Sequence, residues 1–333
     1  MESRTPGRFS DEQFVAKPTE FEMQPNEILE PPKPKRRIIL IAWALAIATI
    51  ASTFFAAVGA WSPQTLIAES AQYQSMLPVR QAFLANWGHG LQFALGLMLI
   101  LVAHELGHYI MTLKYGVPST PPLFIPFPLY SPFGTMGAVI MMQSGSADRK
   151  QIFDIGLAGP LAGLVVAIPL IAYGILHPSP VPFAPEGVMR MGQPLIIQWM
   201  AAIISPETAS QYQMVANNQA TPLLMAGWVG LLVTGINMMP LGQLDGGHVT
   251  FGLLGDKSII VARAAFFAAL TFMIYNKAMV FALMTILVLL MGLRHPPSSD
   301  DSKSLGFARQ LVGWCSLVIP ILCVPANPIT IVS

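Results

Sequence analysis

Long apolar runs separated by short polar stretches follow one another along most of the chain. A helix that crosses a bilayer needs about 20 mainly apolar residues at a rise of 1.5 Å per residue. Runs of this kind occupy residues 38–61, 91–114, 152–176, 223–239, 258–275, 278–293 and 311–324. The pattern predicts an all-α polytopic membrane protein with about seven transmembrane helices.

One apolar stretch carries too many prolines for a helix. Residues 118–150 begin PSTPPLFIPFPLYSP and continue into a β-like run at residues 135–142. Irregular backbone persists inside a membrane only where protein or a water-filled cavity satisfies its polar groups. We therefore expect a short membrane-embedded β-hairpin beside the functional site.

Polar flanks predict the boundaries and the orientation. Residues 1–37 are polar and end in a basic cluster, so we expect a disordered cytoplasmic segment before the first transmembrane helix at residues 38–61. Cytoplasmic flanks of membrane proteins are rich in Lys and Arg. Of the 18 Lys and Arg, this arrangement leaves only Arg80, Arg190 and Lys277 on the other side. The bias directs the N-terminus toward the cytoplasm.

Composition excludes a soluble protein, because only 11% of the residues are charged and 53% are hydrophobic, whereas soluble domains carry about 25% charged residues. A net charge of +1 argues against nucleic acid as a partner. The N-terminal segment is acidic, unlike a transit peptide, so we expect a bacterial plasma membrane. The oligomeric state stays open.

The motif HELGH occupies residues 104–108 inside the apolar run from 91 to 115. Ionisable groups in a membrane helix are costly and usually mark a functional site. His104 and His108 are four residues apart and share one helix face, so both can reach one Zn²⁺. Glu105 can hold and deprotonate a water there. The alternative is that the motif is accidental and its histidines only contact neighbouring helices.

A catalytic zinc needs three protein ligands and one open position. Few acids lie near the membrane segments, which limits the candidates for the third ligand. Asp154 lies at the inner end of the run 152–176, and Asp245 follows the run 223–239 at the depth of HELGH. His248 follows Asp245 by three residues. Spacing alone leaves these candidates open.

Two motifs together resemble a known family. HELGH is followed by Asn237, Pro240, Leu244, Asp245 and Gly246 in the pattern NxxPxxxLDG. This combination resembles the site-2 proteases, which are zinc intramembrane metalloproteases. The resemblance implies a catalytic core at residues 91–255 and C-terminal transmembrane helices at 256–333.

Two further runs narrow the resemblance to one branch of the family. FGTMGAVI at residues 133–140 and GLAGPLAG at residues 156–163 look like the plant plastid and cyanobacterial branch. That branch comprises the ethylene-dependent gravitropism-deficient and yellow-green-like proteases. The small residues of GLAGPLAG also permit close helix approach.

The resemblance assigns roles to residues of this chain. It implies zinc ligation by His104, His108 and Asp245, with Glu105 as the general base and Asn237 orienting the substrate or the oxyanion. It also implies that Pro240 and the pair Gly246–Gly247 break the helix and bring Asp245 to the metal.

Structural alternatives accompany three of the polar residues. Asp245 can instead be a helix N-cap, and Asn237 can form a hydrogen bond between helices. His248 is not expected to be a ligand, because the implied set is complete without it.

The implied function is a zinc metalloendopeptidase that hydrolyses peptide bonds in or near transmembrane segments, as in regulated intramembrane proteolysis. Its partners would be transmembrane protein substrates and the lipid bilayer. One alternative is a catalytically inactive homologue that acts as a membrane-protein chaperone or adaptor, which would not need Glu105. Another is a metal transporter, which would distribute acids and histidines along a path instead of at one depth.

Overall fold

The computed structural model describes residues 36–178, 189–207, 209, 212, 214–216, 220–276, 281–325 and 330–331. The helices are α1 (Arg36–Val58), α2 (Pro63–Gln72), α3 (Leu77–Tyr115), α4 (Arg149–Leu176), α5 (Leu195–Ile204), α6 (Pro222–Asn237), α7 (Asp245–Leu254), α8 (Ser258–Tyr275), α9 (Ala282–Met291), α10 (Gly306–Ser316) and α11 (Ile319–Cys323). The strands are β1 (Leu123–Pro126), β2 (Thr135–Val139), β3 (Met189–Gly192), β4 (Met214–Ala216) and β5 (Thr330–Ile331). The expected disordered segment at residues 1–37 lies outside the described residues, apart from Arg36 and Arg37.

Five helical segments in the described part of the chain are long and apolar enough to cross a membrane. They are Arg36–Val58, Leu77–Tyr115, Arg149–Leu176, Asp245–Tyr275 and Gly306–Cys323. The apolar helices α6 and α9 have only 16 and 10 residues, which is short for a span. The mainly helical architecture is confirmed, but the expected count of seven spans is not.

The helix that carries HELGH is longer than its apolar run. α3 has 39 residues and begins at Leu77, whereas the apolar pattern predicted a start at residue 91. Its first turns contain polar residues, but the Phe83 ring contacts the Phe54 ring of α1, and Asn86 Nδ2 donates to Val58 O at 3.2 Å. α3 ends where Gly116 adopts the left-handed conformation, a common helix stop.

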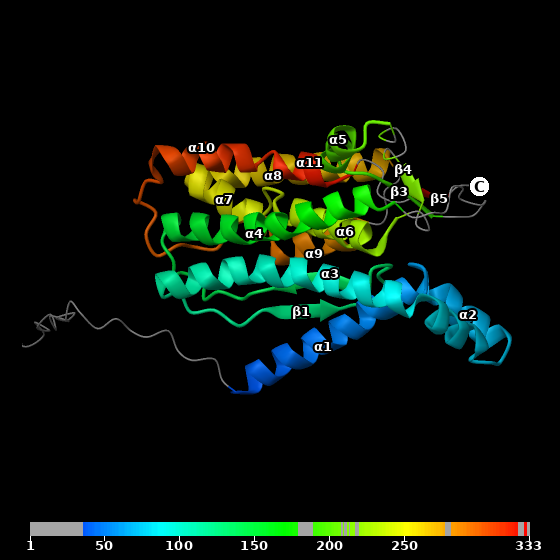
Figure 1. The fold of residues 1–333 in the computed structure, drawn as a ribbon. Coiled ribbons are helices and arrows are strands. Elements are labelled where there is room, and N and C mark those ends of the chain that lie inside the picture. The colour runs from blue at the N-terminus through cyan, green and yellow to red at the C-terminus, as the bar shows by residue number, and fades with distance from the viewer. Residues whose placement is uncertain are drawn as a thin grey trace, which may run out of the picture. The chain divides into compact units, whose positions relative to one another are not determined.

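The core joins the elements that carry the motifs. α3, α4 and α6 pack on one another, and α7 packs on α4. Figure 1 shows α3 and α4 side by side, with α1 running obliquely along α3. The largest side chains between these helices are at most 1% exposed: Phe93, Leu97, Ile171, Met225 and Trp228. Their packing holds α3 and α6 against α4 independently of any polar contact.

The expected β-hairpin is present. β1 and β2 are antiparallel, with Leu123 opposite Val139 and Phe124 opposite Ala138. A bridge between Ser119 and Met142 continues the pairing beyond the strands. Ser52 Oγ of α1 donates to Gly134 O at 2.6 Å and holds the hairpin turn. Among the described residues β2 pairs with β1 only, so its second edge has no strand partner.

The segment between α4 and α6 contains regular structure in its described parts. β3 pairs antiparallel with β4 and β5, and Trp228 Nε1 donates to Gly192 O at 2.9 Å. In α5, Ile197 and Ala201 are fully buried while Trp199 and Ile203 are exposed. This small sheet is therefore tied to the helical core through α6.

Candidate metal centre

The ionisable residues of HELGH lie on one buried turn of α3. His104, Glu105 and His108 are 2%, 3% and 5% exposed. The centroids of the two imidazole rings lie 4.9 Å apart, as expected for residues one turn apart. Such burial is unfavourable for polar side chains unless they bind a partner.

A glycine-bearing face of α4 receives the two imidazoles. The His108 ring donates from Nδ1 to Ile155 O at 2.7 Å, since a carbonyl can only accept. A Cβ atom at Gly159 would lie 2.0 Å from His108 Nε2. A larger residue at this position would therefore displace His108, so the GLAGPLAG run provides space for the ring as well as for close helix contact.

The connection from α6 to α7 positions Asp245. α6 ends at Asn237, Pro240 lies in the turn, and Asp245 is the first residue of α7. A Cβ atom at Gly246 would lie 2.0 Å from Met238 O, so glycine permits the first turn of α7 to close on the end of α6. The glycine pair thus lies inside α7 and not at a helix break. Leu244 occupies the N-cap position, so the N-cap alternative for Asp245 is wrong.

Asp245 meets both histidines at one point. Its Oδ2 atom lies 3.1 Å from His104 Nε2 and 3.3 Å from His108 Nε2. The candidate ligand atoms of the three residues all lie within 4.8 Å of one another. Asp245 lies 137 residues after His108 in the sequence. The fold therefore brings a distant carboxylate to the two histidines of HELGH.

The donor chemistry fits a metal ion. The Nδ1 proton of His108 is directed at Ile155 O, so a neutral ring presents the Nε2 lone pair to the Asp245 carboxylate. Two electron-rich atoms at 3.3 Å repel unless a proton or a cation lies between them. His104 Nδ1 and Glu105 Oε2 are buried and have no hydrogen-bond partner among the described residues. Two imidazoles and a carboxylate suit a catalytic Zn²⁺, and the Ile155 carbonyl orients His108.

A cavity of about 630 Å³ opens beside this cluster, within the range of about 300–1,000 Å³ that is typical of ligand sites. It is lined by His104, Glu105, His108, Asn237 and Asp245, together with residues 138–145, 243–244, 291 and 295–297 among others. The motif residues named here and His248 thus line one cavity, whereas Asp154 is not among its lining residues.

Asp154, which spacing alone left open as a third ligand, lies outside the three-residue cluster. Its carboxylate accepts two hydrogen bonds from Arg309, at 2.7 Å from Nε and 2.9 Å from the terminal nitrogen. The Tyr115 hydroxyl donates to the same carboxylate. These contacts join the end of α3, the start of α4 and α10, and they make Asp154 a structural ion-pair partner.

Sequence reasoning did not identify His295 as part of the cavity. His248 Nδ1 and His295 Nε2 are 2.7 Å apart, and the His295 ring stacks on Phe251 with 4.0 Å between centroids. Burial lowers the pKa of His295 below its usual value, so the ring is neutral near pH 7. The two histidines are 47 residues apart, and no short motif joins them. His248 lies in the cavity wall but outside the three-residue cluster.

Comparison with known proteins places these motifs in a family. Residues 92–283 match Peptidase family M50. Probable zinc metalloprotease EGY1, chloroplastic, from Arabidopsis thaliana is 30% identical over 70% of this chain and 42% of its own length. The protein of the same name from Oryza sativa subsp. japonica is 34% identical over 55% of this chain and 31% of its own length. No solved structure matches.

Another relative, probable zinc metalloprotease EGY2, chloroplastic, from Arabidopsis thaliana, is 30% identical over 51% of this chain and 30% of its own length. The chain spans less than half the length of each of these relatives. Their names agree with the branch of the site-2 proteases that the FGTMGAVI and GLAGPLAG runs suggested, so that resemblance is confirmed.

The relatives also correct one expectation. The sequence predicted a bacterial plasma membrane, with the N-terminus and the active site toward the cytoplasm. The relatives are plant proteins named as chloroplastic, which points to a plastid membrane, so the prediction is wrong. The prediction rested on the acidic character of the N-terminal segment, which by itself does not identify the membrane. The apolar runs do not identify it either, because transmembrane helices need similar apolar lengths in any bilayer.

The family assignment rests on two agreements. HELGH and NxxPxxxLDG lie far apart in the sequence, and the fold brings His104 and His108 of the first motif and Asp245 of the second into one cluster. The family match covers more than half of the 333 residues and includes both motifs. This chain belongs to peptidase family M50.

Proposed function

We propose that this chain is a zinc-dependent intramembrane endopeptidase that cleaves membrane proteins in or near their transmembrane segments. The convergence of His104, His108 and Asp245 beside Glu105 in one cavity is the observation that carries the proposal. The activity printed in the names of the relatives supports it. In this proposal residues 91–255 form the catalytic core, and residues 256–333 form C-terminal membrane helices.

His104, His108 and Asp245 would hold the metal. A bound Zn²⁺ supplies Lewis acidity, which makes a water acidic and polarises a carbonyl group. Glu105 is the general base: its carboxylate takes a proton from the attacking water and later gives that proton to the leaving amine. The buried Oε2 atom of Glu105 has no hydrogen-bond partner in the part of the chain that the structure describes, which supports its role as the proton acceptor.

Asn237 would orient the substrate. It is the last residue of α6 and lines the cavity, so its amide can donate to the scissile carbonyl oxygen where negative charge develops. Preorganised donors of this kind stabilise such charge most strongly where water is excluded. Apolar residues of β2 and the segment after it make up much of the remaining wall and limit the entry of water.

The second edge of β2 and its continuation would hold the substrate backbone. A peptide bond within a helix has its carbonyl in the i→i−4 ladder, so a membrane substrate must unwind before it can be cleaved. Unwound backbone in a membrane needs replacement hydrogen bonds. A free strand edge can provide them without reading side chains. Residues 138–142 lie along the cavity, which supports this role.

The hydrogen bonds of the hairpin indicate which residues face the substrate. Met141 O accepts from Thr120 N at 2.9 Å, and Met141 N donates to Thr120 Oγ1 at 3.0 Å. The backbone of Met141 therefore faces the β1 side of the hairpin. Because backbone groups alternate between the two edges of a strand, Ile140 and Ala138 turn theirs toward the free edge.

We expect proline at Ile140 or Ala138 to lower peptide cleavage by about two- to tenfold, because each substitution removes one donor from the free edge. Proline at Met141 or Val139 is the comparison: it removes a donor from the edge that faces β1, so it should lower thermal stability more than proline at Ile140 or Ala138 does, and cleavage only as far as the hairpin is destabilised. Cleavage rate, metal content and thermal stability are measured for all four variants. Equal losses at all four positions, or none, would favour simple packing of the hairpin over backbone pairing.

The principal rival is a catalytically inactive homologue that binds membrane proteins as a chaperone or adaptor. Both functions predict binding of a membrane protein, but only the peptidase requires a base beside the metal ligands. The presence and burial of Glu105 favour the peptidase. The experiment that separates them must therefore measure hydrolysis.

Metal removal tests the proposal directly. The purified protein is reconstituted in vesicles with a fluorescent transmembrane peptide of about 25 residues, long enough to cross the bilayer. We expect a chelator to stop cleavage and added Zn²⁺ to restore it, whereas Mg²⁺ should not, because nitrogen ligands disfavour it. Cleavage that continues after the metal has been removed, or that never occurs in the zinc-loaded protein, would contradict the proposed activity.

A further inference from the structure

The segment between α9 and α10 contributes to the cavity although it belongs to neither family motif. We call residues 292–303 the strap. His295, Pro296 and Pro297 of the strap line the cavity that also contains the metal cluster. Residues 138–145, which include the free edge of the hairpin, line the same cavity. The strap and the hairpin therefore line the same cavity.

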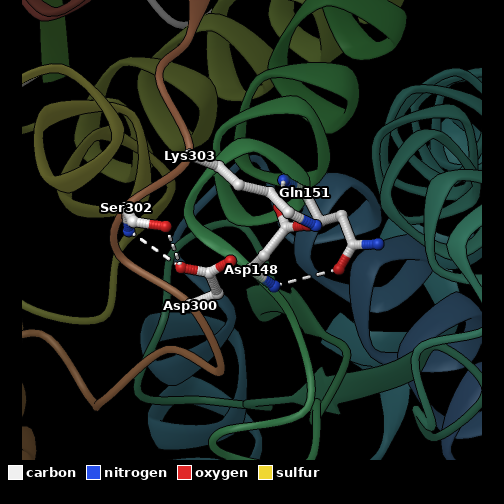
Figure 2. Close-up of polar contacts among 5 residues, drawn as sticks. All are labelled: Asp148, Gln151, Asp300, Ser302 and Lys303. Atoms are coloured by element: carbon white, nitrogen blue, oxygen red, sulfur yellow. Dashed lines mark hydrogen bonds and ion pairs between the residues drawn. The ribbon is translucent and has the colours of Figure 1, made fainter.

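The far end of the strap is fastened to the start of α4. Ser299 N donates to Ala147 O at 2.9 Å, and Arg149 N donates to Asp300 O at 3.1 Å. Lys303 Nζ lies 2.7 Å from Asp148 Oδ2. Figure 2 shows Lys303 and Asp148 side by side at this junction. Two backbone hydrogen bonds and one ion pair thus fix the end of the strap.

The carboxylate of the ion pair is buried and held by further contacts. The Asp148 side chain is 8% exposed, whereas that of Lys303 is 54% exposed. Asp148 also forms a capping box with Gln151 at the start of α4, which Figure 2 shows in part. Burial alone would raise the pKa of Asp148, but Lys303 and the backbone N–H of Gln151 outweigh it and lower that pKa. The carboxylate is therefore ionised and fixed in place, ready to pair with a cation.

The strap also folds on itself and onto α7. Ser302 donates to Asp300 Oδ1 from its backbone nitrogen at 2.9 Å and from its hydroxyl at 2.6 Å, as Figure 2 shows. At the other end, His295 lies 2.7 Å from His248 and stacks on Phe251. The segment is therefore held at both ends, by α7 and by the start of α4, and the residues between these anchors border the cavity.

We propose that the strap is the second wall of the substrate cleft and packs over an extended peptide segment bound along residues 138–142. The Asp148–Lys303 pair and the His248–His295 contact are the positioning contacts that hold this wall. The inference rests on the proposed function, because it assigns the substrate to the same cavity. An unwound segment of a membrane protein fits a cleft with one hydrogen-bonding edge and one proline-bearing wall, since the edge satisfies its backbone while the wall excludes water.

The consequence is an effect on binding and not on chemistry. Lys303 touches neither the metal cluster nor Glu105, so its loss should leave the catalytic groups in place. A more mobile strap loses more conformational entropy when the peptide binds, so the affinity for the peptide should fall. We expect Lys303→Gln to weaken binding by about two- to fivefold, the scale of a partly exposed ion pair. Lys303→Glu should weaken it further, whereas Lys303→Arg should retain wild-type affinity.

Binding is measured in the Glu105→Gln background, where hydrolysis does not interfere. The probe is a fluorescent Leu–Ala transmembrane peptide of about 25 residues with a central Asn-Pro pair, and the full chain is reconstituted in vesicles. Lys257→Gln is the matched control, because Lys257 is exposed and its substitution removes the same positive charge outside the strap. In the active background Lys303→Gln and Lys303→Glu should raise KM and leave kcat unchanged, whereas Lys303→Arg should leave both at the wild-type value.

A contact measurement complements the affinities. A photo-crosslinking residue in place of Pro297 should label the peptide, whereas the same residue in place of Lys257 should not. Absence of labelling at position 297, or unchanged affinity in Lys303→Gln and Lys303→Glu, would overturn the proposal. Parallel loss of metal and of affinity would also overturn it, because that result indicates a general structural role for Lys303. If the peptide binds in a way that depends on Lys303 but the wild type does not cleave it, the peptidase function is contradicted. The role of the strap in peptide binding is then still supported.

Discussion

Glu105→Gln should lose peptide hydrolysis by about 10²- to 10⁴-fold, the usual contribution of a general base, while the protein keeps its metal and its fold. Gln has nearly the shape of Glu but cannot take a proton from water. Glu105 is 3% exposed, and its Oε2 atom makes no hydrogen bond to any residue that the structure describes. The substitution therefore removes the base without breaking a polar contact at that atom.

Three measurements on the reconstituted protein check this result: the cleavage rate, the metal content and the temperature of unfolding. Glu69→Gln is the matched control, because Glu69 is an exposed residue of α2 and undergoes the same chemical change far from the motif in sequence. We expect the control to cleave at the wild-type rate. Near-normal turnover in Glu105→Gln would mean that another group activates the water, and loss of metal would mean that Glu105 supports the site structurally.

The centre of the fold was predictable because its signals are local. An apolar run specifies a membrane helix from length and hydropathy alone, so α1, α4 and α8 lie close to their predicted ranges. HELGH places two histidines on one helix face by periodicity alone. Asp245 was different: its place in the cluster depends on the turn between α6 and α7, and only the family resemblance selected it in the sequence.

The missed features depend on contacts between distant parts of the chain. The first turns of α3 contain Arg80 and His89, so they lack an apolar signal, yet the helix includes them and contacts α1 there through Phe83 and Asn86. The run that predicted a full span at residues 278–293 contains only the ten residues of α9 as described helix. His295 lies in a polar segment without periodicity, and only the tertiary fold brings it to His248.

The glycines of α4 illustrate why the geometry of the site is harder to predict than its chemistry. The sequence identified GLAGPLAG as a surface for close helix packing. It did not show that Gly159 faces the Nε2 atom of His108, which a Cβ would approach to 2.0 Å. Which side chain fills the space beside a glycine depends on the rotation of both helices, and periodicity does not fix that rotation to within one residue.

His108→Ala and Asp245→Ala should each lose most of the bound zinc. Both residues supply a donor to the same cluster, with Asp245 Oδ2 3.3 Å from His108 Nε2. Loss of a residue that only orients a ligand already lowers metal affinity by about 10- to 100-fold, so loss of a ligand should cost at least as much. Hydrolysis should fall with the metal content, because Glu105 alone does not make a water acidic enough.

His248→Ala is the matched control for these two variants. His248 lines the same cavity but lies outside the three-residue cluster, so its removal deletes an imidazole near the site without deleting a ligand. Metal analysis of the purified proteins should show full zinc occupancy in His248→Ala and marked loss in the other two. Full occupancy in both His108→Ala and Asp245→Ala would refute the ligand assignment, whereas zinc loss in His248→Ala would add that residue to the ligand set.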